Sequence, residues 1–125
     1  MKFARYTFLI SGIYGLIVLV PQFFLETKIG QDQPPVITHP EFFYGFISVA
    51  VAFQLVFLII ASDPVKYHVL MLAALVEKFP FSIATIILYS NERIGWQMLA
   101  AGSIDGLLGL LFLMSYLLTR RPQMS

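Results

Sequence analysis

The sequence predicts an all-α fold, namely an integral membrane four-helix bundle whose successive helices run antiparallel, up-down-up-down. Two observations predict it. The chain of 125 residues is 58% hydrophobic and only 12% charged, and its mean hydropathy of +0.82 is too high for a soluble domain of this length. Four long apolar runs also follow one another along it, and a helix needs about 20 apolar residues to cross the ~30 Å hydrocarbon core of a bilayer.

The four predicted spans leave no residues for a second domain, so residues 1–125 are expected to form a single transmembrane domain. The spans cover about 6–25, 42–62, 67–90 and 94–118. The first two are free of charge. The last two have the same length and apolarity but contain ionisable residues near their midpoints.

The connections between the spans are marked by turn-forming residues. The longest connection, roughly 26–41, contains Gly30, Pro34 and Pro35, a composition that resists helix and predicts an ordered loop. Asp63-Pro64 and Asn91-Glu92 indicate two tight turns later in the chain. Connections this short favour antiparallel neighbouring helices.

Lysine and arginine in the short loops predict the orientation, because these residues accumulate on the cytoplasmic side of membrane proteins. One side carries Lys2, Arg5, Lys66, Arg120 and Arg121, whereas the other carries Lys28 and Arg93. Both termini are therefore expected to be cytoplasmic. A bacterial inner membrane and the endoplasmic reticulum both fit this pattern.

Composition excludes several classes of function. The net charge of +1 and the scattered basic residues give no reason to expect a nucleic-acid partner. Without cysteine, the chain has no disulfides, thiolate metal sites or redox relays. No metal-binding spacing, phosphate loop or nucleophile with its base is visible, so we expect no metal and no cofactor.

The strongest functional lead is a cluster of three ionisable residues, Glu77, Lys78 and Asp105, within the last two spans. Each ionised group at the bilayer centre costs ~3 kcal/mol on insertion scales, so all three are expected to face the bundle interior. At 1.5 Å rise per residue, Lys78 and Asp105 both lie about 18 to 20 Å above the cytoplasmic ends of their helices. We expect them to meet, and we expect Glu77 and Asp105 to share one proton.

Small residues and a proline surround this cluster. Gly102 and Gly106 form a G-x-x-x-G spacing, which allows close approach of another helix. Pro80 leaves the carbonyl of Val76 without its helical donor. Three hypotheses stay open for the cluster: a structural interhelical bridge, a site for a ligand, proton or ion, and a surface that faces a partner subunit.

Further candidates are polar residues in or beside the first two spans. Glu26 begins the long connection, where it would converge with His39 and Glu41 in an oxygen and nitrogen site; the favoured alternative is that His39 and Glu41 belong to a capped and solvated helix start. Gln54, Ser11 and Tyr14 are expected to be buried polar groups that bridge helices or line a cavity. Glu26 and Gln54 are therefore candidate ligand-binding residues beside the ionic cluster.

The second span and the segment before it carry a familiar pattern of residues. It consists of Pro40, Phe43, Phe46, Phe53-Gln54-Leu55, Phe57 and Ile60-Ala61 in the second span, and Gly12, Tyr14, Pro21, Glu26 and Pro34-Pro35 before it. Through these residues the stretch 12–61 resembles the sigma-2 receptor and emopamil-binding protein family. The resemblance implies a four-helix fold with a pocket for sterol-like or cationic amphiphilic ligands, and in some members isomerisation of a sterol double bond through acidic residues. Glu26 matches the acidic position after the first span, whereas Ala50 stands where the family has a glutamate. The chain is more loosely similar to small four-helix membrane proteins of the DoxX type.

Taken together, the residues favour a multi-pass membrane protein that binds a lipid-like or sterol-like amphiphile in a cavity near Glu77, Lys78 and Asp105. Membrane lipid and a small amphiphile are its expected partners. The alternative is an accessory subunit of a larger membrane complex, without chemistry of its own, that packs through the glycines of the last span. A homodimeric transporter ranks third. If the protein is an enzyme, the resemblance implies an isomerase acting on a lipid-like substrate.

Overall fold

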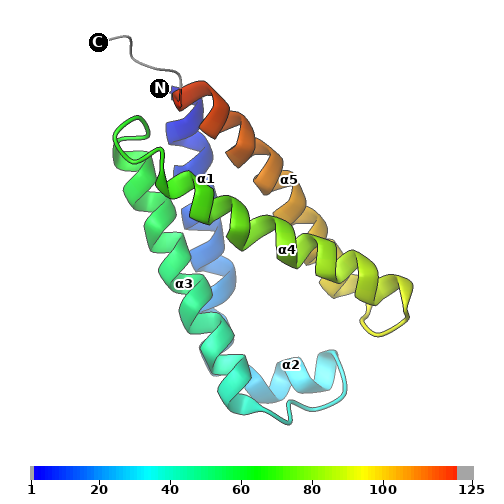
Figure 1. Ribbon diagram of the computed structural model, residues 1–125. Coiled ribbons are helices and arrows are strands. Elements are labelled where there is room, and N and C mark those ends of the chain that lie inside the picture. Colours follow the sequence, from blue (N-terminus) through cyan, green and yellow to red (C-terminus); the bar gives the residue numbers. More distant parts are fainter. Residues whose placement is uncertain (1, 121–125) are drawn as a thin grey trace.

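The computed structural model describes residues 2–120, and within this range it is helical, with no strand (Figure 1). Its helices are α1 (Lys2–Leu19), the short 3₁₀-helix η1 (Val20–Phe24), α2 (Glu26–Asp32), α3 (Pro40–Ser62), α4 (Leu70–Ser90) and α5 (Trp96–Thr119). Four segments are long and apolar enough to cross a membrane: α1 continued by η1, then α3, α4 and α5. These are the four segments expected from the sequence, and they support a multi-pass membrane protein.

Local sequence explains where these helices begin and end. Pro21 has no amide hydrogen to bond the carbonyl of Ile17, and the α-helix gives way to 3₁₀ geometry at Val20. Pro40 occupies the first turn of α3, where a missing amide donor costs nothing. The third span starts at Leu70, three residues later than expected, because a series of turns follows Pro64.

The expectation that the long connection resists helix was wrong for its first part, which forms α2. The prolines that break helices, Pro34 and Pro35, lie beyond Asp32, so they end α2 rather than prevent it. Lys28 pairs with Asp32 one turn later, at 3.1 Å between Nζ and Oδ2. An exposed pair of this kind contributes only about 0.2–0.5 kcal/mol.

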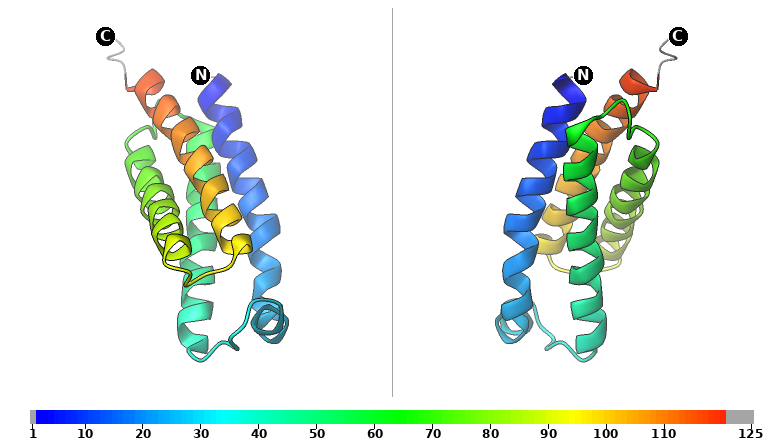
Figure 2. Two further views of the ribbon diagram at one scale, coloured as in Figure 1. Left: turned by 90° about the vertical axis from the view of Figure 1, so that its right-hand side faces the viewer. Right: turned by 90° about the vertical axis from the view of Figure 1, so that its left-hand side faces the viewer.

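The four long helices associate as two pairs. Helix α1 packs along α3, and α4 packs along α5, while contacts between the pairs are fewer (Figure 1, Figure 2). Figure 1 shows the two pairs diverging away from the end that carries the start of α1 and the α3–α4 turn. The molecule is therefore most tightly joined at that end, which we call the joined end.

The hydrophobic core shared by all four long helices lies toward the joined end. Its centre consists of three buried rings from different helices: Phe8 stacks on Phe112 at 4.2 Å between centroids, and Phe57 meets Phe112 edge-on at 4.9 Å. The remaining buried members are Ala4, Ile60, Ala61, Met71 and Ala74. The core draws on the first part of α1 and α4 and on the last part of α3 and α5.

Close approach of α4 and α5 depends on glycines of α5. A Cβ atom on Gly102 would collide with the side chain of Thr85, and one on Gly109 would lie 2.9 Å from the ring of Phe79. Gly106 faces Ser82 in the same way. The G-x-x-x-G spacing is thus used within the chain, between its third and fourth long helices.

Replacing Gly102 with alanine is expected to lower the free energy of unfolding by about 1–3 kcal/mol, because the added methyl group must separate the two helices. Gly45→Ala is the matched control, since nothing lies within 4 Å of a Cβ there. It should leave stability unchanged or raise it by up to about 1 kcal/mol. Unfolding in mixed detergent micelles, followed by circular dichroism, measures both variants; equal losses would contradict the packing described.

Candidate functional site

The structure brings Glu77, Lys78 and Asp105 into one cluster, which we call the ionic triad. The ammonium group of Lys78 donates a hydrogen bond to Asp105, at 3.2 Å from Nζ to Oδ1, and so connects α4 to α5. Lys78 is 5% exposed, and the carboxyl-bearing side chains of Glu77 and Asp105 are 17% and 21% exposed. The charges therefore face inward, as the cost of placing them against lipid requires.

The two carboxylates bind Lys78 unequally. Oε1 of Glu77 lies 3.3 Å from Nζ, close enough for an ion pair, yet within the described residues it has no hydrogen-bond partner. Glu77 also belongs to the same helix as Lys78, so its contact joins no second element. Within the triad, the link between α4 and α5 is consequently the bond from Lys78 to Asp105. That Glu77 and Asp105 share one proton stays a prediction.

Lys78 also contacts the shared core. Its Nζ atom lies 5.3 Å from the centre of the Phe57 ring on α3. A desolvated cation above an aromatic face is stabilised by about 2 kcal/mol. The ionic triad therefore lies at the border of the core, where the helix pairs begin to diverge, and it touches three of the four long helices.

Glu26 and Gln54 do not join the triad through any hydrogen bond or ion pair of the described residues. Glu26, the first residue of α2, accepts a hydrogen bond from the hydroxyl of Tyr44 on α3, at 3.0 Å. The amide of Gln54 is buried at the α1–α3 contact, where Nε2 donates to the carbonyl of Ala50 at 2.8 Å. Its Oε1 occupies the space beside Gly15 and has no hydrogen-bond partner among residues 2–120.

Of the other polar residues of the first span, Ser11 is buried and Tyr14 is not. Ser11 is 2% exposed, and its hydroxyl has no hydrogen-bond partner within residues 2–120. Tyr14 is 41% exposed, so the expectation that it is buried was wrong.

A groove of about 530 Å³ between α1 and α5 is the feature that sequence reasoning missed. Its volume falls within the ~300–1,000 Å³ of sites that hold small molecules. It is lined by Lys2, Phe3, Tyr6, Thr7, Ile10 and Ser11 of α1 and by Leu108 and Leu111 of α5. Apolar residues at helical spacing face lipid as readily as a groove, so this pattern gave no distinct signal.

The groove and the ionic triad are connected through α5. Leu108, which lines the groove, follows Asp105 by three residues, so it lies about one turn further along α5. Because the ion pair with Lys78 fixes the rotation of α5 about its axis, it also fixes the position of that groove wall. The apolar groove therefore has one wall, α5, that is bound to α4 by the ion pair between Lys78 and Asp105.

Asp105→Asn is expected to destabilise the fold by up to about 3 kcal/mol, because it leaves the buried ammonium without its interhelical carboxylate. Glu77→Gln, the control within the same triad, should cost clearly less, since its carboxylate makes no hydrogen bond and joins no second helix. Chemical unfolding in mixed micelles compares the two. A larger loss for Glu77→Gln would contradict the unequal roles.

Comparison of the chain with protein-family models, curated proteins and solved structures gives no match in any of the three sets. None of the three bears on the resemblance over residues 12–61.

Proposed function

We propose that this protein is an integral membrane four-helix bundle with antiparallel successive spans, and that it binds a lipid-like or sterol-like amphiphile in the groove between α1 and α5. The single observation that carries the proposal is the groove itself: about 530 Å³, lined mostly by apolar side chains, and one helical turn from Asp105. Its two walls belong to helices that are each apolar enough to cross a membrane. A ligand would therefore enter sideways from the bilayer.

The orientation that we propose places the joined end in the cytoplasm. Lys2, Arg5, Lys66 and Arg120 belong to this end, whereas Lys28 and Arg93 belong to α2 and the α4–α5 turn. Arg121, which also entered the count from the sequence, lies outside the described residues. The bias of basic residues toward the cytoplasmic side supports this orientation.

The ionic triad serves the proposed function as the support of one groove wall. Lipid chains are as apolar as the groove, so transfer from the bilayer brings little hydrophobic gain, and affinity must come from shape and polar contacts. A wall held in one position keeps that shape before the ligand arrives, which reduces the entropy lost on binding. Asp105, bonded to Lys78 and adjoining Leu108, provides this rigidity.

The alternative, an accessory subunit that docks through the glycines of α5, has less support. Gly102, Gly106 and Gly109 face Thr85, Ser82 and Phe79 of α4. A partner could not use that surface without displacing α4. Amphiphile binding needs no such rearrangement, because the groove lies on another side of α5.

Ile10→Trp is expected to block the groove, since Ile10 lines it and is 64% exposed, so the larger ring fits without disturbing the core. Ile17→Trp is the matched control: Ile17 lies two turns later on the same helix, is 68% exposed and does not line the groove. Lysophosphatidylglycerol and cholesterol, added separately to the purified protein in maltoside micelles, are the probes.

Thermal unfolding is the measurement. A ligand present at 100 times its Kd stabilises the folded state by about 2.7 kcal/mol, which corresponds to a rise of several degrees. At least one probe should raise the Tm of the wild type and of Ile17→Trp but not that of Ile10→Trp. If neither probe raises the Tm of the wild type, or if both tryptophan variants respond alike, the proposal is wrong.

A further inference from the structure

We infer that the occupant of the α1–α5 groove is an anionic phospholipid from the leaflet around the joined end, with one acyl chain in the groove and its phosphate at Lys2. This inference rests on the proposed function and adds the chemical class of the ligand. Three features carry it: the charge at the groove mouth, the basic surroundings of that mouth, and the depth of the groove.

Among residues 2–120, one charged residue lines the groove, and it is a cation. Lys2 stands at the start of α1, is exposed, and within the described part of the chain no carboxylate lies within ion-pair distance of it. The next lining residues with polar groups are Tyr6 and Thr7, whose hydroxyls can donate hydrogen bonds. No acidic residue of the described range lines the groove, so its described lining repels a cationic amphiphile at the mouth and attracts an anionic one.

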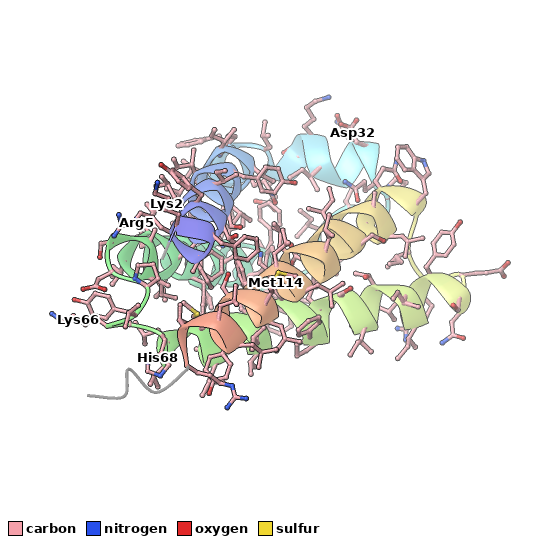
Figure 3. All side chains as sticks on the ribbon, turned by 90° about the horizontal axis from the view of Figure 1, so that it is seen from above. Lys2, Arg5, Asp32, Lys66, His68 and Met114 are labelled. Atoms are coloured by element: carbon pink, nitrogen blue, oxygen red, sulfur yellow. The ribbon has the colours of Figure 1, made fainter. Side chains whose placement is uncertain are left out.

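The joined end around the mouth carries a net positive charge. Among residues 2–120 it holds Lys2, Arg5, Lys66 and Arg120 against the exposed Asp63 of the α3–α4 turn. Arg5 donates from its Nε to the carbonyl of Ala61 on α3, at 3.2 Å, and does not line the groove. In the view from above, Lys66 and His68 lie on the side of the α3–α4 turn (Figure 3). These basic residues attract an anionic leaflet to this end, but among them only Lys2 lines the groove.

The depth of the groove matches one leaflet. Lys2 and Ser11, its first and last lining residues on α1, are nine residues apart, which corresponds to about 13.5 Å along a helix. Half of the ~30 Å hydrocarbon core is about 15 Å. A phosphate at Lys2 therefore leaves an acyl chain of the same leaflet alongside Ile10, Leu108 and Leu111, and the chain ends near the bilayer centre.

The experiment compares two lipids with the same acyl chains and the same phosphate but different net headgroup charge, the anionic dioleoylphosphatidylglycerol and the zwitterionic dioleoylphosphatidylcholine. Each is added to the purified protein in micelles, and native mass spectrometry measures the fraction of protein with one lipid bound. The wild type should bind the glycerol lipid about fivefold more tightly, the factor expected from one lysine near an anionic headgroup. Lys2→Gln should reduce that ratio to near one.

Lys66→Gln is the matched control, because Lys66 is an exposed lysine at the same end that does not line the groove. It should keep the preference. Equal binding of the two lipids by the wild type, or equal effects of the two lysine changes, would overturn the assignment of an anionic ligand but leave the groove as a binding site. A preference that persists in Ile10→Trp would place the lipid outside the groove and overturn the proposed function as well.

Discussion

An ionised side chain at the centre of a bilayer costs ~3 kcal/mol, and this chain places Glu77, Lys78 and Asp105 within two of its apolar helices. The bond from Lys78 to Asp105 is the arrangement that hides these charges. Because a helix turned about its axis would expose them, the bond sets which face α4 and α5 present to each other. The glycine face of α5 then meets α4, and Leu108 faces α1.

The shared core and the ionic triad complement each other. Phe8, Phe57 and Phe112 join α1, α3 and α5 toward one end, and Lys78 of α4 lies against Phe57 at the border of that core. Beyond the border the helices continue as two pairs. The proposed site depends on both features, because the core brings α1 and α5 together while the triad fixes the rotation of α5.

The sequence alone predicted those parts of the structure that depend on large free energies, namely the transfer of apolar helices and of charged groups into lipid. The four long segments follow from length and apolarity, and the meeting of Lys78 with Asp105 follows from the cost of charge in lipid. Helix α2 was missed because proline and glycine were counted over a whole connection, although Pro34 and Pro35 lie beyond its end. Whether such a short helix forms depends on small local energies.

The pairing of the helices and the groove between α1 and α5 could not be predicted from the sequence, for a different reason. Gln54 is directed toward α1 by the space at Gly15, a fit between two helices that no single segment reveals. Ile10 of the groove and Ile17 outside it are both exposed isoleucines on one face of α1. Lipid-facing and ligand-facing residues are equally apolar in a membrane helix, so only the assembled helices distinguish them.

The most direct test is a double-mutant cycle between Lys78 and Asp105. The free energy of unfolding in mixed micelles is measured for the wild type, Lys78→Met, Asp105→Leu and the double variant, with Glu77 present in all four. The bond observed here predicts a coupling energy above about 1 kcal/mol, so that the double variant loses less than the sum of the single losses. Losses that add within about 0.3 kcal/mol would show that the two side chains do not support each other, and would contradict the account.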